Sequence, residues 1–256
     1  MTPFHIENHS FKLSILELFF VIIFGYTLYL IYFFYTNQIK ANGKNNFSIF
    51  VCHNCSNLYN KWHVFSALII FIKGYSCSQC KKKGKPLEIF LAIIFIPLVI
   101  LNFIFFNKID FLFFSLFQIF LFSIAQIDYE MMILNIKSIL VIIMLGLIYK
   151  ISKHSFDILI FKDMVLSFIV GWFLVYSISY LYKIFRGEEG FGSGDKWLLG
   201  SLGIWFGYFD IIFIFFHSCI FATAYIFIFK LYKKNLTQKI PIGTFFCLTS
   251  IIYLFL

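Results

Sequence analysis

The chain has 256 residues, of which 61% are hydrophobic and 13% are charged, and its mean hydropathy is +0.89. Soluble domains carry about 25% charged residues, so the composition excludes an ordinary soluble domain and indicates a polytopic membrane protein. The formal net charge of +9 would suit a nucleic-acid-binding protein, but the distribution of the charges argues against that class.

Apolar segments of membrane-spanning length recur along the chain. A helix needs about 20 apolar residues to cross a bilayer core, and about 17 are tolerated. We therefore predict an all-α polytopic membrane protein with about eight transmembrane helices, near residues 14–36, 87–106, 111–127, 133–149, 164–185, 197–209, 211–230 and 240–256. The sixth is short and is joined to the seventh by FGYFD with almost no loop, so the boundaries of that pair stay open. The first segment is too long to be a removable signal peptide, and it lacks the small-residue cleavage site of one.

The hydrophilic residues are concentrated in one large loop. The chain divides into a first transmembrane segment (1–36), a loop (37–86) and a transmembrane region (87–256). If the loop is cytoplasmic and the eight segments alternate, 16 of the 21 lysines and arginines face the cytoplasm, in agreement with the positive-inside rule. The basic charge is then explained by topology and by contact with anionic lipid heads. We expect the lipid bilayer, and no nucleic acid, as a partner.

Four cysteines in the loop form two CxxC pairs with 21 residues between them: Cys52, Cys55, Cys77 and Cys80. Two such turns supply the tetrahedral ligand set of a structural zinc site, and disulfides rarely persist in the cytoplasm. We predict a small cytoplasmic zinc-binding loop domain whose closed site folds the loop and does not catalyse. Redox-active CxxC pairs and unbound thiols are the alternatives. Cys219 and Cys247 lie in apolar segments and are expected to be small buried hydrophobic residues.

Two aspartates stand apart from the other acids. Asp128 ends the third apolar segment and Asp195 begins the sixth, so the span count places both at the cytoplasmic face. Two carboxylates that share a site do not both ionise easily; one keeps a proton while the other acts as a base toward water. Other acids near segment ends are expected to be solvated at the interface: Asp110, Asp157, Asp163 and Asp210.

The stretch GFGSGDK places glycines directly before Asp195. Gly192 and Gly194 are expected to permit a close approach of the backbone and a positive φ. An ordinary turn between helices is the simpler reading of such a loop.

These stretches together resemble the type IV leader peptidase (prepilin peptidase) family. EEGFGSGDKWLLGSLG looks like its GxGD motif, AQIDYEMMILN is similar to its other catalytic stretch, and IPIGTFF resembles its closing Pro-Phe-Gly element. The tetracysteine loop matches its N-terminal cytoplasmic domain. The resemblance covers nearly the whole chain in the same order.

The resemblance implies an aspartic endopeptidase of the bacterial inner (cytoplasmic) membrane, with its active site facing the cytoplasm. Its substrates would be type IV prepilins or pseudopilins, from which it would remove the basic leader, and it would also N-methylate the new terminus with S-adenosylmethionine. Asp128 and Asp195 would be the catalytic pair, Gly192 and Gly194 the supporting glycines, and the four cysteines the zinc ligands. The sequence does not locate the S-adenosylmethionine site.

The chain departs from the family pattern at two positions. Asn135-Ile136 stands where Pro-Asp is common, and Lys196 follows Asp195 directly where the family commonly has a lysine two residues after the aspartate. The departures leave open the geometry at the start of the next helix and the role of Lys196.

Two other classes of protein remain open. Intramembrane acids also line ion pathways, so a transporter, or a scaffold whose zinc loop recruits a partner, is the main alternative. A thiol-disulfide carrier built on the CxxC pairs is the other.

Overall fold

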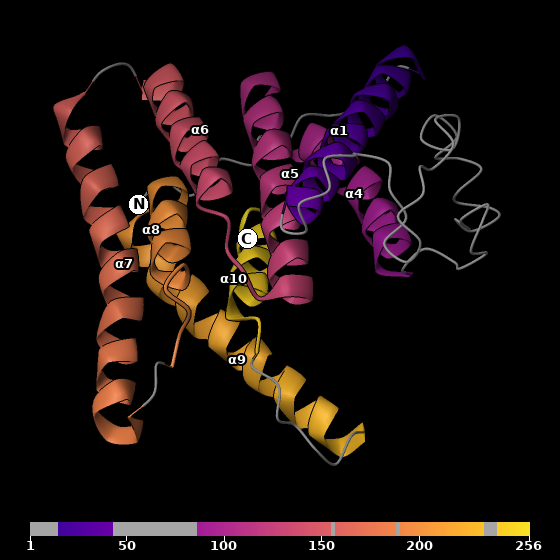
Figure 1. Ribbon diagram of the computed structural model, residues 1–256. Helices are drawn as coiled ribbons and strands as arrows, with labels where there is room; N and C mark the ends of the chain where they lie inside the picture. Colours follow the sequence, from indigo (N-terminus) through magenta and orange to yellow (C-terminus); the bar gives the residue numbers. More distant parts are fainter. Residues whose placement is uncertain (1–14, 43–85, 155–156, 188–189, 233–239) are drawn as a thin grey trace. The chain divides into compact units, whose positions relative to one another are not determined.

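The structure is a computed structural model that describes residues 15–42, 86–154, 157–187, 190–232 and 240–256 (Figure 1). The regular elements in these ranges are helices, which confirms the prediction of an all-α fold for the described part of the chain. Two compact units, Met1–Ile119 and Phe120–Leu256, divide the chain within helix α5.

Unit 1 is held by a buried polar cluster. Its described helices are α1 (Ile15–Asn42), α4 (Pro86–Phe105) and the first part of α5 (Lys108–Met131). The Asn102 amide donates to Oε1 of Gln118 at 2.9 Å and to Oγ of Ser115 at 3.2 Å, and Nε2 of Gln118 donates to Oδ1 of Asn102 at 3.2 Å. Because an unpaired polar group in an apolar interior is costly, this reciprocal pair fixes how α4 packs on α5.

Unit 2 is built around a short helix. Its described elements are the end of α5, α6 (Ile136–His154), α7 (Ile158–Arg186), α8 (Asp195–Phe206), α9 (Tyr208–Tyr232) and α10 (Ile242–Tyr253). Helix α8 contacts α6, α7, α9 and α10 (Figure 1). Ten of its 12 residues are buried, and its first residue, Asp195, is one of them. The helix therefore begins in the interior of the unit.

Small residues allow α7 and α8 to approach closely. A Cβ on Gly171 would lie 2.6 Å from the carbonyl oxygen of Leu199, and one on Gly203 would overlap the carbonyl oxygen of Ser167. Such contacts between backbones are typical of membrane helices, whose association depends on close packing.

Local signals explain where several helices begin and end. Asp157 caps α7, because its carboxylate accepts the N–H of Leu159 at 3.0 Å. Gly187 ends α7 with a φ of 76°, a conformation that glycine adopts without strain. Gly207, with a φ of 95°, is the single residue between α8 and α9, and this resolves the pair of segments whose boundaries the sequence left open.

Three helices of the described residues are long and apolar enough to cross a membrane: α5, α7 and, in α9, Tyr208–Ile228. Each of the eight predicted segments overlaps a helix, but α8 and α10 have 12 residues each. At about 1.5 Å per residue they are about 18 Å long, shorter than the hydrocarbon core of about 30 Å. Eight complete spans are therefore not confirmed.

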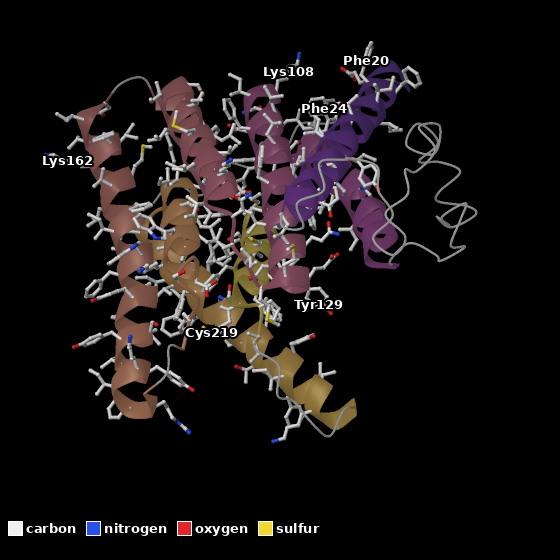
Figure 2. The ribbon with its side chains drawn as sticks, in the orientation of Figure 1. Phe20, Phe24, Lys108, Tyr129, Lys162 and Cys219 are labelled. Atoms are coloured by element: carbon white, nitrogen blue, oxygen red, sulfur yellow. The ribbon has the colours of Figure 1, made fainter. Side chains whose placement is uncertain are left out.

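Figure 2 shows Lys162, in the first turns of α7, at the upper left of the view and Tyr129, at the C-terminal end of α5, near its middle. The expectation of a solvated position holds for the exposed side chains of Asp157 and Asp163, but it is wrong for Asp110, which is 7% exposed in the first turn of α5. A helix N-terminus favours a carboxylate, which explains why an acid is tolerated there.

Candidate active site

Asp128 lies in the last turn of α5, and its carboxylate contacts the first turn of α10. Its side chain is buried, with 5% of its surface exposed. Oδ2 accepts the backbone N–H of Thr244 at 2.8 Å and the hydroxyl of Thr244 at 3.1 Å. The first N–H groups of a helix have no partner within the helix, and the residue that precedes α10, Pro241, makes no side-chain cap. Asp128 therefore caps α10 from another helix.

Asp195 is the first residue of α8, and the preceding loop holds its carboxylate. Its side chain is 6% exposed. Oδ2 accepts the N–H of Gly192 at 2.8 Å, while the N–H of Asp195 donates to the carbonyl oxygen of Gly192 at 3.1 Å. These two bonds close the turn on itself and fix the orientation of the carboxylate.

The structure brings the two predicted aspartates together in unit 2. Burial and then the nearby charge of Asp128 raise the pKa of Asp195 from 3.8 to about 7, although the hydrogen bond from the Gly192 N–H opposes both. Leu134 packs between the two sides of the site: it lies against the backbone of Gly194 and against that of Gly243, where an added Cβ would meet Oδ2 of Asp128 at 3.0 Å. The carboxyl groups therefore share one buried environment.

The glycines before Asp195 are needed for space, and the expectation that they adopt positive φ is wrong. Gly194 has a φ of −81° and precedes α8 in a helical conformation, and the positive-φ glycines of the described residues are Gly187 and Gly207. A Cβ on Gly194 would lie 2.7 Å from Cβ of Leu134, and one on Gly192 would lie 3.2 Å from Oδ2 of Asp195. Their small size lets the loop close over the carboxylate.

The connection from α5 to α6 is short and strained. Met132 has a φ of 54°, the one positive φ outside glycine among the described residues, and its N–H donates to the carbonyl oxygen of Asp128 at 2.8 Å. Asn135 directly precedes α6, and its side chain accepts the N–H of Lys137 at 3.0 Å, as an N-cap does. The departure from the family pattern at Asn135 therefore gives a capped start of α6.

Lys196 points to aromatic rings of α7. Its Nζ lies 5.4 Å from the ring centre of Trp172 and 5.9 Å from that of Tyr176, and these two rings stack at 5.0 Å. A lysine over aromatic faces is stabilised electrostatically, so the structure gives Lys196 a structural partner other than Asp195.

The predicted zinc ligands lie outside the described residues, since Cys52, Cys55, Cys77 and Cys80 fall in residues 43–85. In the part of the chain that the structure describes, no group of three or more potential metal ligands occurs. Cys247 is buried in α10, as expected, and Cys219 is half-buried in α9.

Sequence reasoning missed two residues of this site, Leu134 and Thr244. The signal for Thr244 was present in IPIGTFF, where Pro241 directly precedes an apolar helix, because a residue in the first turn of a helix offers an unpaired N–H. For Leu134 the sequence holds no such signal, since a leucine in an apolar stretch is not distinctive.

The helical fold and the apolar helices are consistent with a membrane protein, and unit 2 holds a buried pair of carboxyl groups. Residues 115–227 match the family model described as the type IV leader peptidase family, and the matched range contains both aspartates. The chain matches no curated protein and no solved structure. This match supports assignment of the region to the type IV leader peptidase family and, in general terms, the peptidase activity of that family.

Proposed function

We propose that the protein is a membrane aspartic endopeptidase that removes the basic leader peptide of type IV prepilins or pseudopilins. The observation that carries the proposal is the shared burial of Asp128 and Asp195 within the region that matches the family. Peptide hydrolysis needs one group that takes a proton from water and one that gives a proton to the carbonyl oxygen, and a carboxyl pair with one proton provides both.

The two carboxyl groups can carry out each proton transfer of peptide hydrolysis. The ionised carboxylate removes a proton from a water molecule, whose oxygen forms a bond to the peptide carbon, while the protonated carboxyl gives its proton to the carbonyl oxygen. The proton taken from water then passes to the leaving nitrogen as the peptide bond breaks, and one hydroxyl proton of the intermediate returns to the carboxyl that donated, which restores the pair with one proton. Burial of both groups excludes bulk water and strengthens these interactions.

Cleavage of a prepilin by the purified full chain in detergent tests the proposal. We expect that Asp128→Asn and Asp195→Asn each abolish cleavage, by a factor of at least about 1,000 as is usual when one member of a catalytic unit is removed. Asp157→Asn is the matched control, because this exposed aspartate caps α7 and asparagine caps equally well. Unimpaired cleavage by Asp195→Asn would refute the pair and would favour a transporter or scaffold.

The placement of the site at the cytoplasmic face of the bacterial inner membrane is part of this proposal. The positive-inside rule supports it, since 16 of the 21 basic residues face the cytoplasm if the eight predicted segments alternate. A Tyr129→Cys variant should react with a membrane-impermeant thiol reagent in inverted vesicles and be protected in intact cells. Labelling from outside the cell would refute the orientation.

We further propose a structural zinc ion on the four loop cysteines and N-methylation of the cleaved pilin with S-adenosylmethionine. Zinc on four thiolates folds a loop and leaves no open position for substrate, so it takes no part in cleavage. Metal analysis should find zinc in the wild-type protein and none in Cys77→Ser. Mass spectrometry of cleaved pilin, with and without S-adenosylmethionine, should show one added methyl group; an unchanged mass would refute the second activity.

A further inference from the structure

Thr244 stands out because it gives two donors to one oxygen atom. Its N–H and its hydroxyl both contact Oδ2 of Asp128, at 2.8 Å and 3.1 Å. Its side chain is 9% exposed, so water does not easily replace either bond. The contact joins residues that are 116 positions apart.

The two donors of Thr244 differ in the protonation states of Asp128 with which they are compatible. A backbone N–H only donates, so it favours the form of Asp128 that accepts at Oδ2. The hydroxyl has one proton and two nearby acceptors, Oδ2 of Asp128 and the carbonyl oxygen of Ala125 at 3.0 Å. It therefore donates to Asp128 when the carboxylate is ionised, and it turns to Ala125 when Asp128 carries a proton.

The surroundings of Asp195 are less favourable to charge. Among the described residues its Oδ2 accepts one hydrogen bond, from the N–H of Gly192, and the charge of Asp128 acts on it. The titratable groups that act on one another here are Asp128 from α5, Asp195 from α8 and Cys247 from α10. Each hydrogen bond from a donor stabilises the ionised form of a carboxylate. The surroundings of Asp128 therefore favour ionisation more than those of Asp195.

We propose that Thr244 is a positioning residue that orients Asp128 and keeps it as the ionised member of the pair, so that Asp128 is the base and Asp195 the proton donor. The inference rests on the proposed function for the meaning of these roles. The hydrogen bonds of Thr244 and the single donor to Asp195 carry the assignment.

Hydroxyl-deleting variants test this role through the pH dependence of cleavage. In Thr244→Val the shape is kept and one donor is lost. We expect the acid limb of kcat/KM for a prepilin to move to higher pH by about one unit, the size expected for one hydrogen bond to a charged acceptor. At pH values well below the original midpoint of the acid limb this is a loss of about tenfold in kcat/KM. Thr244→Ser keeps the hydroxyl and should restore the wild-type profile.

A second threonine of the same helix provides a matched control. Thr249 is also buried, and its hydroxyl has no hydrogen-bond partner, so Thr249→Val should leave the profile unchanged. Thr244→Ala serves as the second hydroxyl-free variant if valine disturbs folding, which the midpoint of thermal unfolding reports. A wild-type profile in both hydroxyl-free variants, or an equal movement in Thr249→Val, would overturn the role of Thr244.

A direct titration separates this inference from the proposed function. If the wild-type protein cleaves no prepilin, the proposed function fails, and the inference is then tested by infrared titration of the carboxyl groups, with Asp128→Asn assigning the band. The ionisation that this substitution removes should move to higher pH by about one unit in Thr244→Val. An unmoved band would overturn the inference even if cleavage by the wild-type protein is normal.

Discussion

Replacement of Asp195 by Asn should stabilise the folded protein at alkaline pH while it abolishes cleavage. The pKa of Asp195 is about 7 in the folded chain, because burial and then the charge of Asp128 oppose ionisation, against 3.8 in its ordinary state. Between these values the folded protein holds a proton that the unfolded chain has released, so the free energy of unfolding falls as the pH rises from 3.8 to about 7.

The magnitude follows from the same two values. Each pH unit corresponds to about 1.4 kcal/mol, so an ionised Asp195 destabilises the folded state by on the order of 4 kcal/mol above pH 7. Asparagine has no charge, and its carbonyl oxygen still accepts the N–H of Gly192. The gain should be largest near pH 8 and should fall toward zero at about pH 4, where both states of the wild-type residue are protonated.

Denaturation of the two proteins in one detergent, at about pH 8 and about pH 4, measures this difference. Asp157→Asn is the control, since that carboxylate is exposed at the start of α7 and its replacement should change stability at neither pH. If Asp195→Asn unfolds at the same midpoint as the wild-type protein at both values, Asp195 is not buried beside a second carboxylate, and the reasoning is refuted.

Three further substitutions test the packing. Gly171→Ala should lower the free energy of unfolding by about 1–3 kcal/mol, because its Cβ would lie 2.6 Å from the carbonyl oxygen of Leu199; unchanged stability would contradict the close packing of α7 and α8. Met132→Gly should raise the free energy of unfolding by up to about 1 kcal/mol, because glycine relieves the φ of 54°; a lower midpoint would contradict this. Asn102→Leu should cost about 1–3 kcal/mol by leaving Gln118 unpaired, and the double variant with Gln118→Leu should recover much of it; additive losses in a double-mutant cycle would contradict the amide pair.

The helices were predictable because apolar length is visible in a sequence, whereas their ends depend on conformation. Gly207 breaks an apolar run with a φ of 95°, and hydropathy does not register such a break. Ile240 and Pro241 are apolar but precede α10. For these reasons the sixth and eighth segments gave helices shorter than the predicted spans.

The two aspartates were predictable for a different reason: other acids also lie near the ends of apolar segments, but span counting placed these two at one face. Their surroundings were not predictable in the same way. The turn from Gly192 to Asp195 is local, and its glycines mark it in the sequence. These glycines are needed because a Cβ would not fit, and not because the backbone adopts a positive φ. The partner of Asp128 lies 116 residues away on α10, and only the packing of unit 2 brings it there.

The arrangement explains how two carboxylates are kept in an apolar unit. Each lies at a helix N-terminus, Asp195 in its own helix and Asp128 at the start of α10, where the helix dipole and unpaired N–H groups favour negative charge. An ammonium group beside Asp195 would favour ionisation of both acids and would leave no proton to donate. Lys196 instead lies over the rings of Trp172 and Tyr176. A proton shared by the pair would balance its charge, and this is the state that the proposed acid–base hydrolysis requires.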